Sequence, residues 1–472
     1  MTISLRHKHR DRRNRPEQSA VRCRCVLPVL LAPILALAFI APPAAADDAL
    51  PQPSFFSSAS AARPEKRVFA HYMLCCGSFG RNVAAAERDI RLAQEMGLDG
   101  FALNAGSWSR EPYYQKSAAA MFEAAERLGT GFALFFSADM CCGLSADDIR
   151  DMVETYGNRP NYFRKDGRIV LSTFAGERAG DAFWRNEVLA PLRDAGFPVF
   201  FVPAFYPVTA SGRPADEVAH WGDLIDGLFR FAPDATPFGE QSTVASSEAY
   251  ARALAGAGKL FLAGYYPFYW GALQSSAGRR YFEYRGGLGT ERQWRSIIAV
   301  QDPPWVEVVT WNDPNESYLI APADDPDGFH KPHLAFAELN RYFIAWFKSG
   351  VRPVITKDAL FYFYRTHGKL LAAPDDPAGP VTRLYGEPED AIYVTTALTA
   401  PAELIVESGS ARSEHRLEAG LSHIAVPFAA GAQHFELRRN GRRLSAIDGE
   451  PVAQSITRYN FFYTTGFVES DP

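Results

Sequence analysis

The sequence lacks the excess of positive charge with which nucleic-acid-binding proteins meet phosphate. The 472-residue chain has a formal net charge of −5. Its first 46 residues hold eight Lys and Arg but only two Asp and Glu, a net charge of +6, so the remainder of the chain carries −11. This acidic remainder gives no support for a nucleic-acid partner.

The chain also lacks a long uninterrupted apolar run. Its most apolar stretch, residues 26–43, contains Pro28 and Pro33 and is short for a membrane span of about 20 residues. A basic segment precedes the stretch and small residues ending at Ala46 follow it, which is the pattern of a secretory signal peptide. We predict a signal peptide at residues 1–46 and a secreted or periplasmic protein without a stable membrane span after cleavage. An uncleaved N-terminal anchor is the alternative.

Cysteine is scarce and strongly clustered. Of six cysteines, two precede Ala46, and the others form two adjacent pairs, Cys75–Cys76 and Cys141–Cys142. Adjacent cysteines lack the spacing of two to four residues that structural zinc sites use, so we expect no metal. In an oxidising compartment an even number of cysteines favours disulfides. We predict at least one bridge between the pairs; a bond within each pair and a zinc site are the alternatives.

No glycine-rich phosphate loop follows the first apolar segment, which disfavours a doubly wound nucleotide-binding fold. Instead, apolar strand-like segments alternate with helical patterns. Strands are predicted at residues 66–74, 98–106, 130–139, 168–176, 197–207, 224–233, 259–271 and 304–313, and helices at 83–97, 117–129, 146–157, 181–196, 246–258, 290–301 and 333–350. This alternation predicts an α/β fold, a (β/α)8 TIM barrel over residues 66–351, preceded by a linker at residues 47–65. A doubly wound open sheet is the alternative.

The pattern changes near residue 352. From there to residue 472 the chain has short runs, many of alternating polarity, separated by Gly, Pro and Asp. Such runs are typical of antiparallel strands joined by turns. We predict a smaller C-terminal β-rich domain, an antiparallel β-sandwich.

Polar and aromatic residues follow the predicted barrel strands, where a TIM barrel has its active site. Aromatic residues make up 13% of the chain, and aromatic rings offer stacking surfaces for sugars. The candidates for substrate binding at these strand ends are His71, Asn104, Asp139, Tyr206, Tyr269, Trp270, Trp311 and Asn312.

Asp313 ends the eighth predicted strand, and Glu316 comes three residues later. Glycoside cleavage uses two carboxyl groups, one that donates a proton and one that is ionised. Inverting enzymes hold the two about 6.5–9.5 Å apart, with room for a water molecule. A three-residue offset on non-helical backbone permits that span, and a loop Asp and Glu that bind nearby backbone amides fits the same spacing. The pair is the candidate catalytic site.

The chain resembles glycoside hydrolase family 71, the α-1,3-glucanases or mutanases. The resemblance rests on stretches such as "VFAHYM", "DIRLAQEMGLDGFALNAG", "LSTFAGE", "PFYWGAL" and "VEVVTWNDPNESYLIAP", which occur in order through residues 68–322. It implies a barrel with a C-terminal β-rich domain and an inverting hydrolysis of a polysaccharide that needs no metal or cofactor.

The resemblance also implies roles for single residues. It places the catalytic carboxylates on Asp313 and Glu316, and by analogy with the related endo-mannanase pattern Glu316 is the general acid and Asp313 the base. Arg285 joins the expected substrate-binding residues. The chain departs from the family pattern at Ala204, where an Asp is usual, and at Pro314–Asn315, where Tyr-Gly is usual.

The reaction class predicted in this way is the hydrolysis of an α-linked glucan, α-1,3-glucan first. Two other functions fit the sequence as well. One is an endo-α-mannanase-like or other exopolysaccharide hydrolase. The other is a non-catalytic polysaccharide-binding protein that keeps the barrel as a scaffold.

Overall fold

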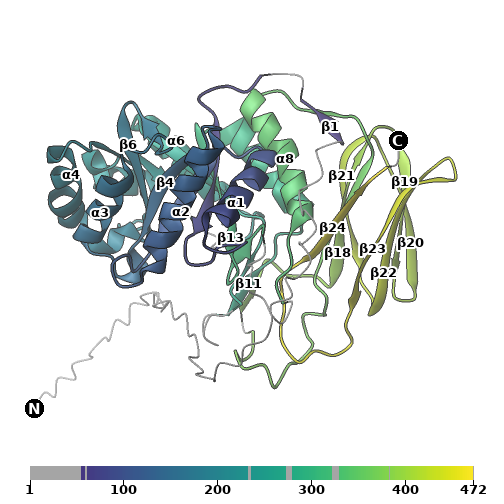
Figure 1. Ribbon diagram of the computed structural model, residues 1–472. Coiled ribbons are helices and arrows are strands. Elements are labelled where there is room, and N and C mark those ends of the chain that lie inside the picture. The colour runs from purple at the N-terminus through teal and green to yellow at the C-terminus, as the bar shows by residue number, and fades with distance from the viewer. Residues whose placement is uncertain are drawn as a thin grey trace, which may run out of the picture.

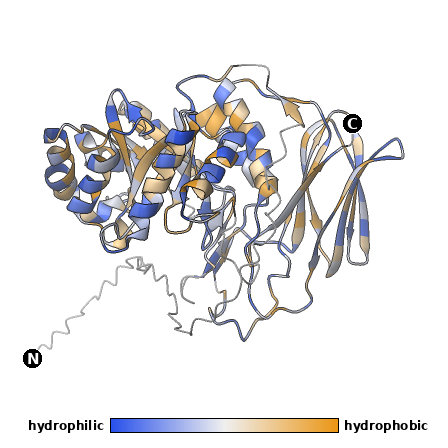
Figure 2. Cartoon of the chain, viewed as in Figure 1, coloured by the Kyte–Doolittle hydropathy of each residue, from blue (hydrophilic) through white to orange (hydrophobic). Residues whose placement is uncertain are grey.

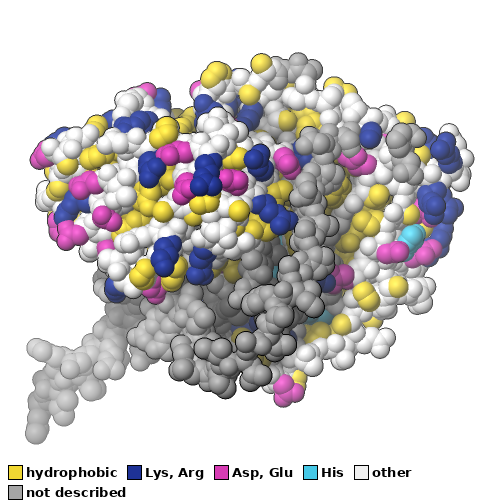
Figure 3. All heavy atoms as spheres, viewed as in Figure 1, with side chains coloured by type: hydrophobic (Ala, Val, Ile, Leu, Met, Phe, Trp, Pro, Cys, Tyr) yellow, Lys and Arg dark blue, Asp and Glu magenta, His cyan; other side chains and the backbone are white. Residues whose placement is uncertain are grey.

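The computed structural model describes residues 55–58, 61–231, 235–272, 279–320, 329–381 and 383–470. The predicted signal peptide, residues 1–46, lies outside these ranges, as does most of the predicted linker. Figure 1 shows a part in which helices surround a sheet, and a part toward the C-terminus built from strands. On the face shown in Figure 3, acidic and basic side chains are interspersed over the described surface.

A nine-stranded sheet lies at the centre of the first part. Consecutive parallel strands pair in chain order at all places but one, and the last strand also pairs with the first, since β12 is hydrogen-bonded to both β9 and β2. The parallel strands are β2 (Arg67–Met73), β3 (Gly100–Ala105), β4 (Ala133–Asp139), β6 (Arg168–Phe174), β7 (Val199–Phe201), β8 (Gly227–Phe229), β9 (Leu260–Tyr265) and β12 (Trp305–Val308). The short β5 (Arg164–Lys165) is antiparallel to β6, so the sheet is mixed.

Strands β7 and β8 form the two ends of this pairing order. Backbone hydrogen bonds join them just beyond the paired residues. Phe201 O accepts from Asp226 N at 2.9 Å, and Pro203 O accepts from Phe229 N at 2.9 Å. The two ends of the sheet therefore lie side by side.

A helix follows each parallel strand. The helices are α1 (Val83–Glu95), α2 (Tyr113–Leu128), α3 (Ala146–Tyr156), the π-helical η3 (Phe183–Leu189) continued by α4 (Ala190–Asp194), α5 (Pro214–Trp221), α6 (Thr243–Gly256), α7 (Gly287–Ser296) continued by the π-helical η5 (Ile297–Gln301), and α8 (Leu334–Ser349). Short 3-10 helices are η1 (Met140–Cys142), η2 (Gly176–Ala179) and η4 (Gly222–Leu224). Figure 2 shows hydrophilic residues on the outer faces of these helices and apolar residues along the strands between them.

Local sequence signals explain several helix ends. Ser145 Oγ accepts from Asp148 N at 3.1 Å, and the Asp148 carboxylate accepts from Ser145 N at 2.9 Å, a capping box that begins α3 as the sequence predicts. Gly129, at φ +62°, ends α2, because a left-handed residue there is favourable only without a side chain. The sequence pattern did not predict α5, which begins at a proline.

The second part consists of two antiparallel four-stranded sheets. One has the order β21-β18-β16-β24 and the other β20-β19-β22-β23. Buried side chains of both sheets form one cluster, in which Tyr362 and Val394 of the first meet Leu404 and Phe435 of the second. The strands are β16 (Ala359–Tyr364), β18 (Ala391–Leu398), β19 (Ala402–Ser408), β20 (Ala411–Leu417), β21 (Gly420–Pro427), β22 (Gly431–Arg439), β23 (Arg442–Val452) and β24 (Thr464–Glu469).

Part of the predicted linker belongs to the folded structure. Its β1 (Phe56–Ser57) pairs with β15 (Val354–Ile355). Phe55 is fully buried and stacks on Tyr342 of α8, with ring centroids 5.9 Å apart. Composition suggested a connector here, but two adjacent phenylalanines supply enough apolar surface to dock the segment.

Candidate active site

The predicted catalytic pair lies on a small hairpin that follows β12. Strand β13 (Asn312–Asp313) pairs with β14 (Ser317–Tyr318). Glu316 N donates to Asp313 O at 3.4 Å, and a four-residue turn of this kind brings its end Cα atoms within about 7 Å. Asp313 Oδ1 accepts from Asn315 N at 2.9 Å. Both carboxyl groups are partly exposed, so the turn holds two accessible acids near each other.

A tyrosine and an arginine support Glu316. Tyr269 OH donates to Glu316 Oε1 at 2.9 Å and accepts from Arg280 Nη2 at 3.2 Å. Burial acts to lower the pKa of Arg280, but the charges of Tyr269, Glu316 and Tyr206 outweigh it, and the pKa lies above its usual value. The tyrosine belongs to β10 (Tyr269–Trp270) and the arginine to β11 (Arg280–Phe282), which pair with each other. This second hairpin fixes the direction of the Glu316 carboxyl group.

Three predicted substrate-binding residues form a buried chain of hydrogen bonds inside the parallel sheet. Asn104 Nδ2 lies 3.1 Å from His71 Nε2 and 3.5 Å from Asp139 Oδ2, and His71 Nδ1 lies 2.7 Å from Glu307 Oε1. Because an amide nitrogen only donates, Nε2 must accept, which places the proton of a neutral imidazole on Nδ1, facing Glu307. One tautomer therefore satisfies both ring nitrogens.

The carboxyl groups at the two ends of this chain are desolvated. Burial raises the pKa of Glu307 against the opposing effect of His71, and it raises the pKa of Asp139 against the hydrogen bonds from Cys141 N and Asn104. Glu307 lies on the fully buried strand β12 and is not among the predicted site residues. Its acidic side chain inside the apolar run "VEVV" was the available signal.

Trp311 and Asn312 connect the catalytic hairpin to the first strand. Trp311 N donates to His71 O at 2.8 Å, and Asn312 Oδ1 accepts from Met73 N at 2.8 Å. The Trp311 indole is fully buried and donates to Asp89 Oδ1 of α1 at 2.7 Å. Trp311 thus packs in the core, in place of the expected position on a sugar-contacting surface.

Comparisons with known proteins identify the family of this chain. A profile of glycosyl hydrolase family 71 matches residues 64–471. The chain belongs to glycosyl hydrolase family 71. It is therefore a glycoside hydrolase, as the sequence analysis predicted, and the alternative of a non-catalytic binding protein is set aside.

Two relatives and one solved structure show what this family 71 enzyme is similar to. Glucan endo-1,3-alpha-glucosidase agn1 of Schizosaccharomyces pombe is 31% identical over 426 residues, covering 85% of this chain and 94% of that protein. Mutanase Pc12g07500 of Penicillium rubens is 28% identical over 431 residues, covering 88% and 91%. The solved GH99 endo-alpha-mannosidase from Bacteroides thetaiotaomicron has a TM-score of 0.48 at 14% identity, covering 60% of this chain and 97% of that one.

Two other aromatic residues of the family 71 enzyme, Trp270 and Tyr206, were also candidates for sugar binding, and they differ in exposure. Trp270 is fully buried, with its ring 5.1 Å from that of Phe461, so it belongs to the core and not to the expected sugar-contacting surface. Tyr206 is partly exposed, and its ring lies 6.0 Å from that of Phe174. The sequence pattern could not separate the two cases, because both residues follow an apolar strand.

Arg285 lies apart from the contacts around Glu316. Its guanidinium is 5.0 Å from the ring of Phe238, and it lines a cavity between α7 and the C-terminal strands β18 and β21. The arginine beside Glu316 is Arg280, five positions earlier on β11. The resemblance placed the arginine near the correct hairpin, but only the strand pairing decides which one faces Glu316.

The two cysteine pairs lie at the same edge of the sheet. Cys75 and Cys76 follow β2, and Cys141 and Cys142 form part of η1 after β4. Burial raises the pKa of Tyr114, and Cys75 and Cys142 both lie close enough to raise it further, which places the loops near one another. Within the described chain no disulfide is formed, and Cys75 Sγ lies 2.6 Å from Cys76 Sγ. The bridge between the loops stays a prediction.

Two general properties of the enzyme complete the description. Across the described ranges, no group of three or more His, Cys, Asp or Glu side chains has an arrangement that could hold a metal ion. None of the helices within those ranges combines the length and apolar character that a membrane span requires.

Proposed function

We propose that this protein is a secreted or periplasmic hydrolase of α-1,3-glucan that inverts the anomeric centre, with Asp313 and Glu316 as its two catalytic carboxyl groups. The observation that carries the proposal is the β13–β14 turn, which holds both acids, with Tyr269 donating to Glu316 at 2.9 Å. The names of the family 71 relatives support the glucan substrate. The basic and apolar N-terminal segment supports export.

The same proposal includes the complete architecture. We propose that the parallel sheet closes into a (β/α)8 barrel through the β7–β8 hydrogen bonds, and that the two C-terminal sheets form a β-sandwich. The chain-order pairing, with β12 bonded to β2, supports the barrel. The shared cluster of buried side chains supports the sandwich. In a barrel, the catalytic turn lies at the carboxyl end of the strands, where such active sites occur.

In the proposed reaction, Glu316 donates its proton to the glycosidic oxygen as the bond from that oxygen to the anomeric carbon breaks. A water molecule attacks the anomeric carbon from the opposite face, and its proton passes to the Asp313 carboxylate. The α-linkage thus yields a β-configured reducing end. Tyr269 holds the Glu316 carboxyl group in a fixed direction for the transfer, with Arg280 behind it.

The other predicted site residues take supporting roles in this proposal. Tyr206 offers a partly exposed ring to a bound sugar. The buried chain of His71, Asn104 and Asp139 fixes the floor of the site, since each residue is less than a tenth exposed. Asn312 fixes the catalytic hairpin to the end of β2 through Met73.

The substitutions Asp313→Asn and Glu316→Gln test the catalytic pair. Each removes a proton-transfer group, so kcat on an α-1,3-glucan should fall by about 10²–10⁴-fold. Activity on an α-glucosyl fluoride distinguishes the general acid from the general base, because fluoride leaves without a proton donor. Glu316→Gln should retain activity on the fluoride, and Asp313→Asn should not. The reverse result would exchange the two roles.

Exposed carboxylates away from the hairpin provide matched controls. Asp375→Asn and Glu403→Gln make the same chemical changes on the surface and should leave kcat unchanged. Proton NMR of the first products reports the anomer formed, and an initial α-anomer would contradict inversion. A panel that includes α-1,4-glucan and α-mannan identifies the substrate; cleavage of α-mannan alone would favour the exopolysaccharide alternative.

A further inference from the structure

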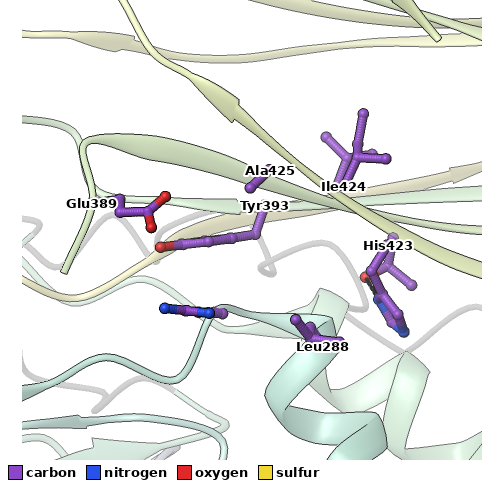
Figure 4. Close-up of a pocket in the computed structure, with 9 residues that line it drawn as sticks. Leu288, Glu389, Tyr393, His423, Ile424 and Ala425 are labelled. Carbon is purple, nitrogen blue, oxygen red and sulfur yellow. Dashed lines mark hydrogen bonds between the residues drawn. The ribbon is translucent and has the colours of Figure 1, made fainter. Parts of the chain in front are cut away.

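We propose that the cavity between α7 and the C-terminal strands β18 and β21 is a second, non-catalytic binding site for one glucosyl residue of the polysaccharide. The identity of this ligand rests on the proposed function, but the site is built from other residues. The residues whose side chains line the cavity include Arg285, Leu288, Glu389, Tyr393, Thr395 and His423. Figure 4 shows Glu389, Tyr393 and His423 of the C-terminal part around the space above Leu288 of α7.

The cavity has the size of a single sugar ring. Its volume is about 180 Å³, the space of roughly six water molecules, and below the ~300–1,000 Å³ typical of pockets for larger ligands. Leu288 is 37% exposed and Glu389 is exposed, so the space opens to solvent. One residue of a longer glucan chain can therefore enter while the rest of the chain stays outside.

Polar groups in this cavity have hydrogen-bonding capacity that the described protein leaves unused. Tyr393 is only 5% exposed, and its hydroxyl has no hydrogen-bond partner within the described chain. A buried hydroxyl without a partner costs free energy of about 1–3 kcal/mol. Such a group at the wall of an open cavity indicates a ligand that completes its hydrogen bonds.

Two charged side chains flank the tyrosine. The described residues supply neither the Arg285 guanidinium nor the Glu389 carboxylate with a side-chain hydrogen bond or an ion pair. Both lie close enough to Tyr393 to affect its pKa, which burial raises most, Glu389 raises further and Arg285 lowers. Two residues further along β18, on the same face as Tyr393, Thr395 Oγ1 lies 2.9 Å from His423 Nδ1, and His423 Nε2 pairs with Glu291. The Thr395–His423 pair is thus internally satisfied, whereas Arg285, Glu389 and Tyr393 present donors and acceptors that no described residue uses.

This combination fits a neutral polyhydroxyl ligand. Adjacent sugar hydroxyls both donate and accept, so they can donate to Glu389, accept from Arg285 and do either with Tyr393. Glu389 disfavours an anion and Arg285 disfavours a cation, since like charges repel in a site of low dielectric. Leu288 and Ala425, which is paired with Tyr393 and faces the same side of the sheet, offer apolar surface to the C–H face of the ring.

A site here would act with the catalytic hairpin without taking part in the reaction. Its residues come from the start of α7 and from β18 and β21, whereas the catalytic acids lie on β13–β14. Binding at two points on one polymer raises the effective concentration of the second contact. The cavity would hold the enzyme on insoluble polysaccharide while the active site cleaves.

Calorimetric titration with an α-1,3-linked thio-oligosaccharide tests the site, because the sulfur linkage resists hydrolysis and the unaltered enzyme can be used. Tyr393→Phe removes only the unsatisfied hydroxyl and should leave folding intact. We expect it to remove one binding event or to weaken it at least tenfold, and Glu389→Gln should do the same. Glu403→Gln, an exposed acid on the other C-terminal sheet, should bind as the parent does.

The proposal is overturned if the stoichiometry is the same in the parent, Tyr393→Phe and Glu389→Gln, which would mean that the cavity holds only water. Failure of the proposed function has a different signature. In that case Asp313→Asn and Glu316→Gln would still hydrolyse the oxygen-linked glucan, whatever the stoichiometry of the thio-oligosaccharide. The two failures are distinguishable in the parent: without the proposed substrate it neither hydrolyses the oxygen-linked glucan nor binds the thio-oligosaccharide, whereas without the second site it is active and binds the thio-oligosaccharide with the same stoichiometry as the variants.

Discussion

At Asp89 a single buried carboxyl group supports the segment that leads into the catalytic hairpin. Its Oδ1 accepts from Trp311 Nε1 at 2.7 Å and its Oδ2 from Tyr72 OH at 2.9 Å. Burial nevertheless raises the pKa of Asp89 to about 7. Full removal from water outweighs two hydrogen bonds, because desolvation disfavours the charged form.

This pKa predicts a contribution of Asp89 to the pH dependence of stability. An unfolded aspartate has a pKa of about 3.9, so between about pH 4 and pH 7 the folded state binds more protons than the unfolded state. The contribution is therefore present at low pH and is lost as the pH rises through 7. In Asp89→Asn this loss is absent, while the acceptor to Trp311 remains.

Urea unfolding at pH 4.5 and pH 7.0 measures the effect. Between these two pH values the free energy of unfolding should fall by about 3 kcal/mol more in the parent than in Asp89→Asn, since one pKa unit corresponds to about 1.4 kcal/mol. Asp375→Asn, at an exposed position, should follow the parent. Parallel pH profiles for the parent and Asp89→Asn would show that Asp89 is ionised throughout in the folded protein.

At the scale of elements, two hairpins from different parts of the chain form the candidate active site. Trp270 N donates to Glu316 O at 2.9 Å, and Ala272 N donates to Asn315 O at 2.9 Å. The β10–β11 hairpin is therefore bonded to the catalytic turn through its backbone as well as through Tyr269. A substitution that displaces one hairpin should therefore displace the other as well.

Tyr269→Phe tests this coupling. The ring remains and only the hydroxyl is lost, so the Glu316 carboxyl group loses its donor. As Glu316 gives up its proton its carboxylate becomes charged, and a hydrogen bond to a charged group contributes about 1.5–3 kcal/mol, so kcat should fall by about tenfold or more. KM should change little if the hydroxyl positions Glu316 and does not bind sugar.

Tyr265→Phe is the matched control for that substitution. Tyr265 is equally buried, and its hydroxyl lies 2.9 Å from Thr290 Oγ1, on the side of α7. It should lower stability to a similar extent while kcat remains that of the parent. Equal losses of kcat in the two variants would mean that the effect of Tyr269 is a general loss of stability.

At the scale of the whole molecule, the sheet-and-helix part and the C-terminal part share one core. Phe361 and Phe363 of β16, together with Phe461 and Tyr463, belong to the same buried cluster as the parallel strands. Tyr463 OH donates to Glu283, and His333 lies 3.0 Å from Tyr463 O. An interface of this kind resembles a domain interior and does not behave as a flexible joint.

We therefore predict that a shortened chain, residues 55–350, does not fold alone. Removal of the C-terminal part would expose the apolar faces of α8 and of the β10–β11 hairpin. The fragment should bind a hydrophobic dye and lack a sharp near-ultraviolet dichroism spectrum. The full chain should unfold in one calorimetric transition, and a fragment with its own cooperative transition near that temperature would contradict this view.

Much of the fold follows from periodic patterns that short windows of sequence contain. The apolar runs that became β2, β3, β4 and β6, and the helical repeats of α1, α3 and α8, were predicted from residue spacing alone. These patterns arise because one face of each element is buried, and the spacing of apolar residues within a single short segment is enough to predict the element. Predictions were weaker where little such signal exists: α5 was missed, and β7 and β8 are three residues each.

By itself, the sequence determined the family, the order of the strands and helices, and the two acids after the eighth strand, because these depend on residue type and spacing. Only the tertiary structure decided that Arg280 and not Arg285 lies beside Glu316, that Trp270 and Trp311 are buried, and that Glu307 faces His71. These outcomes depend on which side of a strand a residue faces and on what lies opposite it. That information comes from distant segments that meet only when the chain folds.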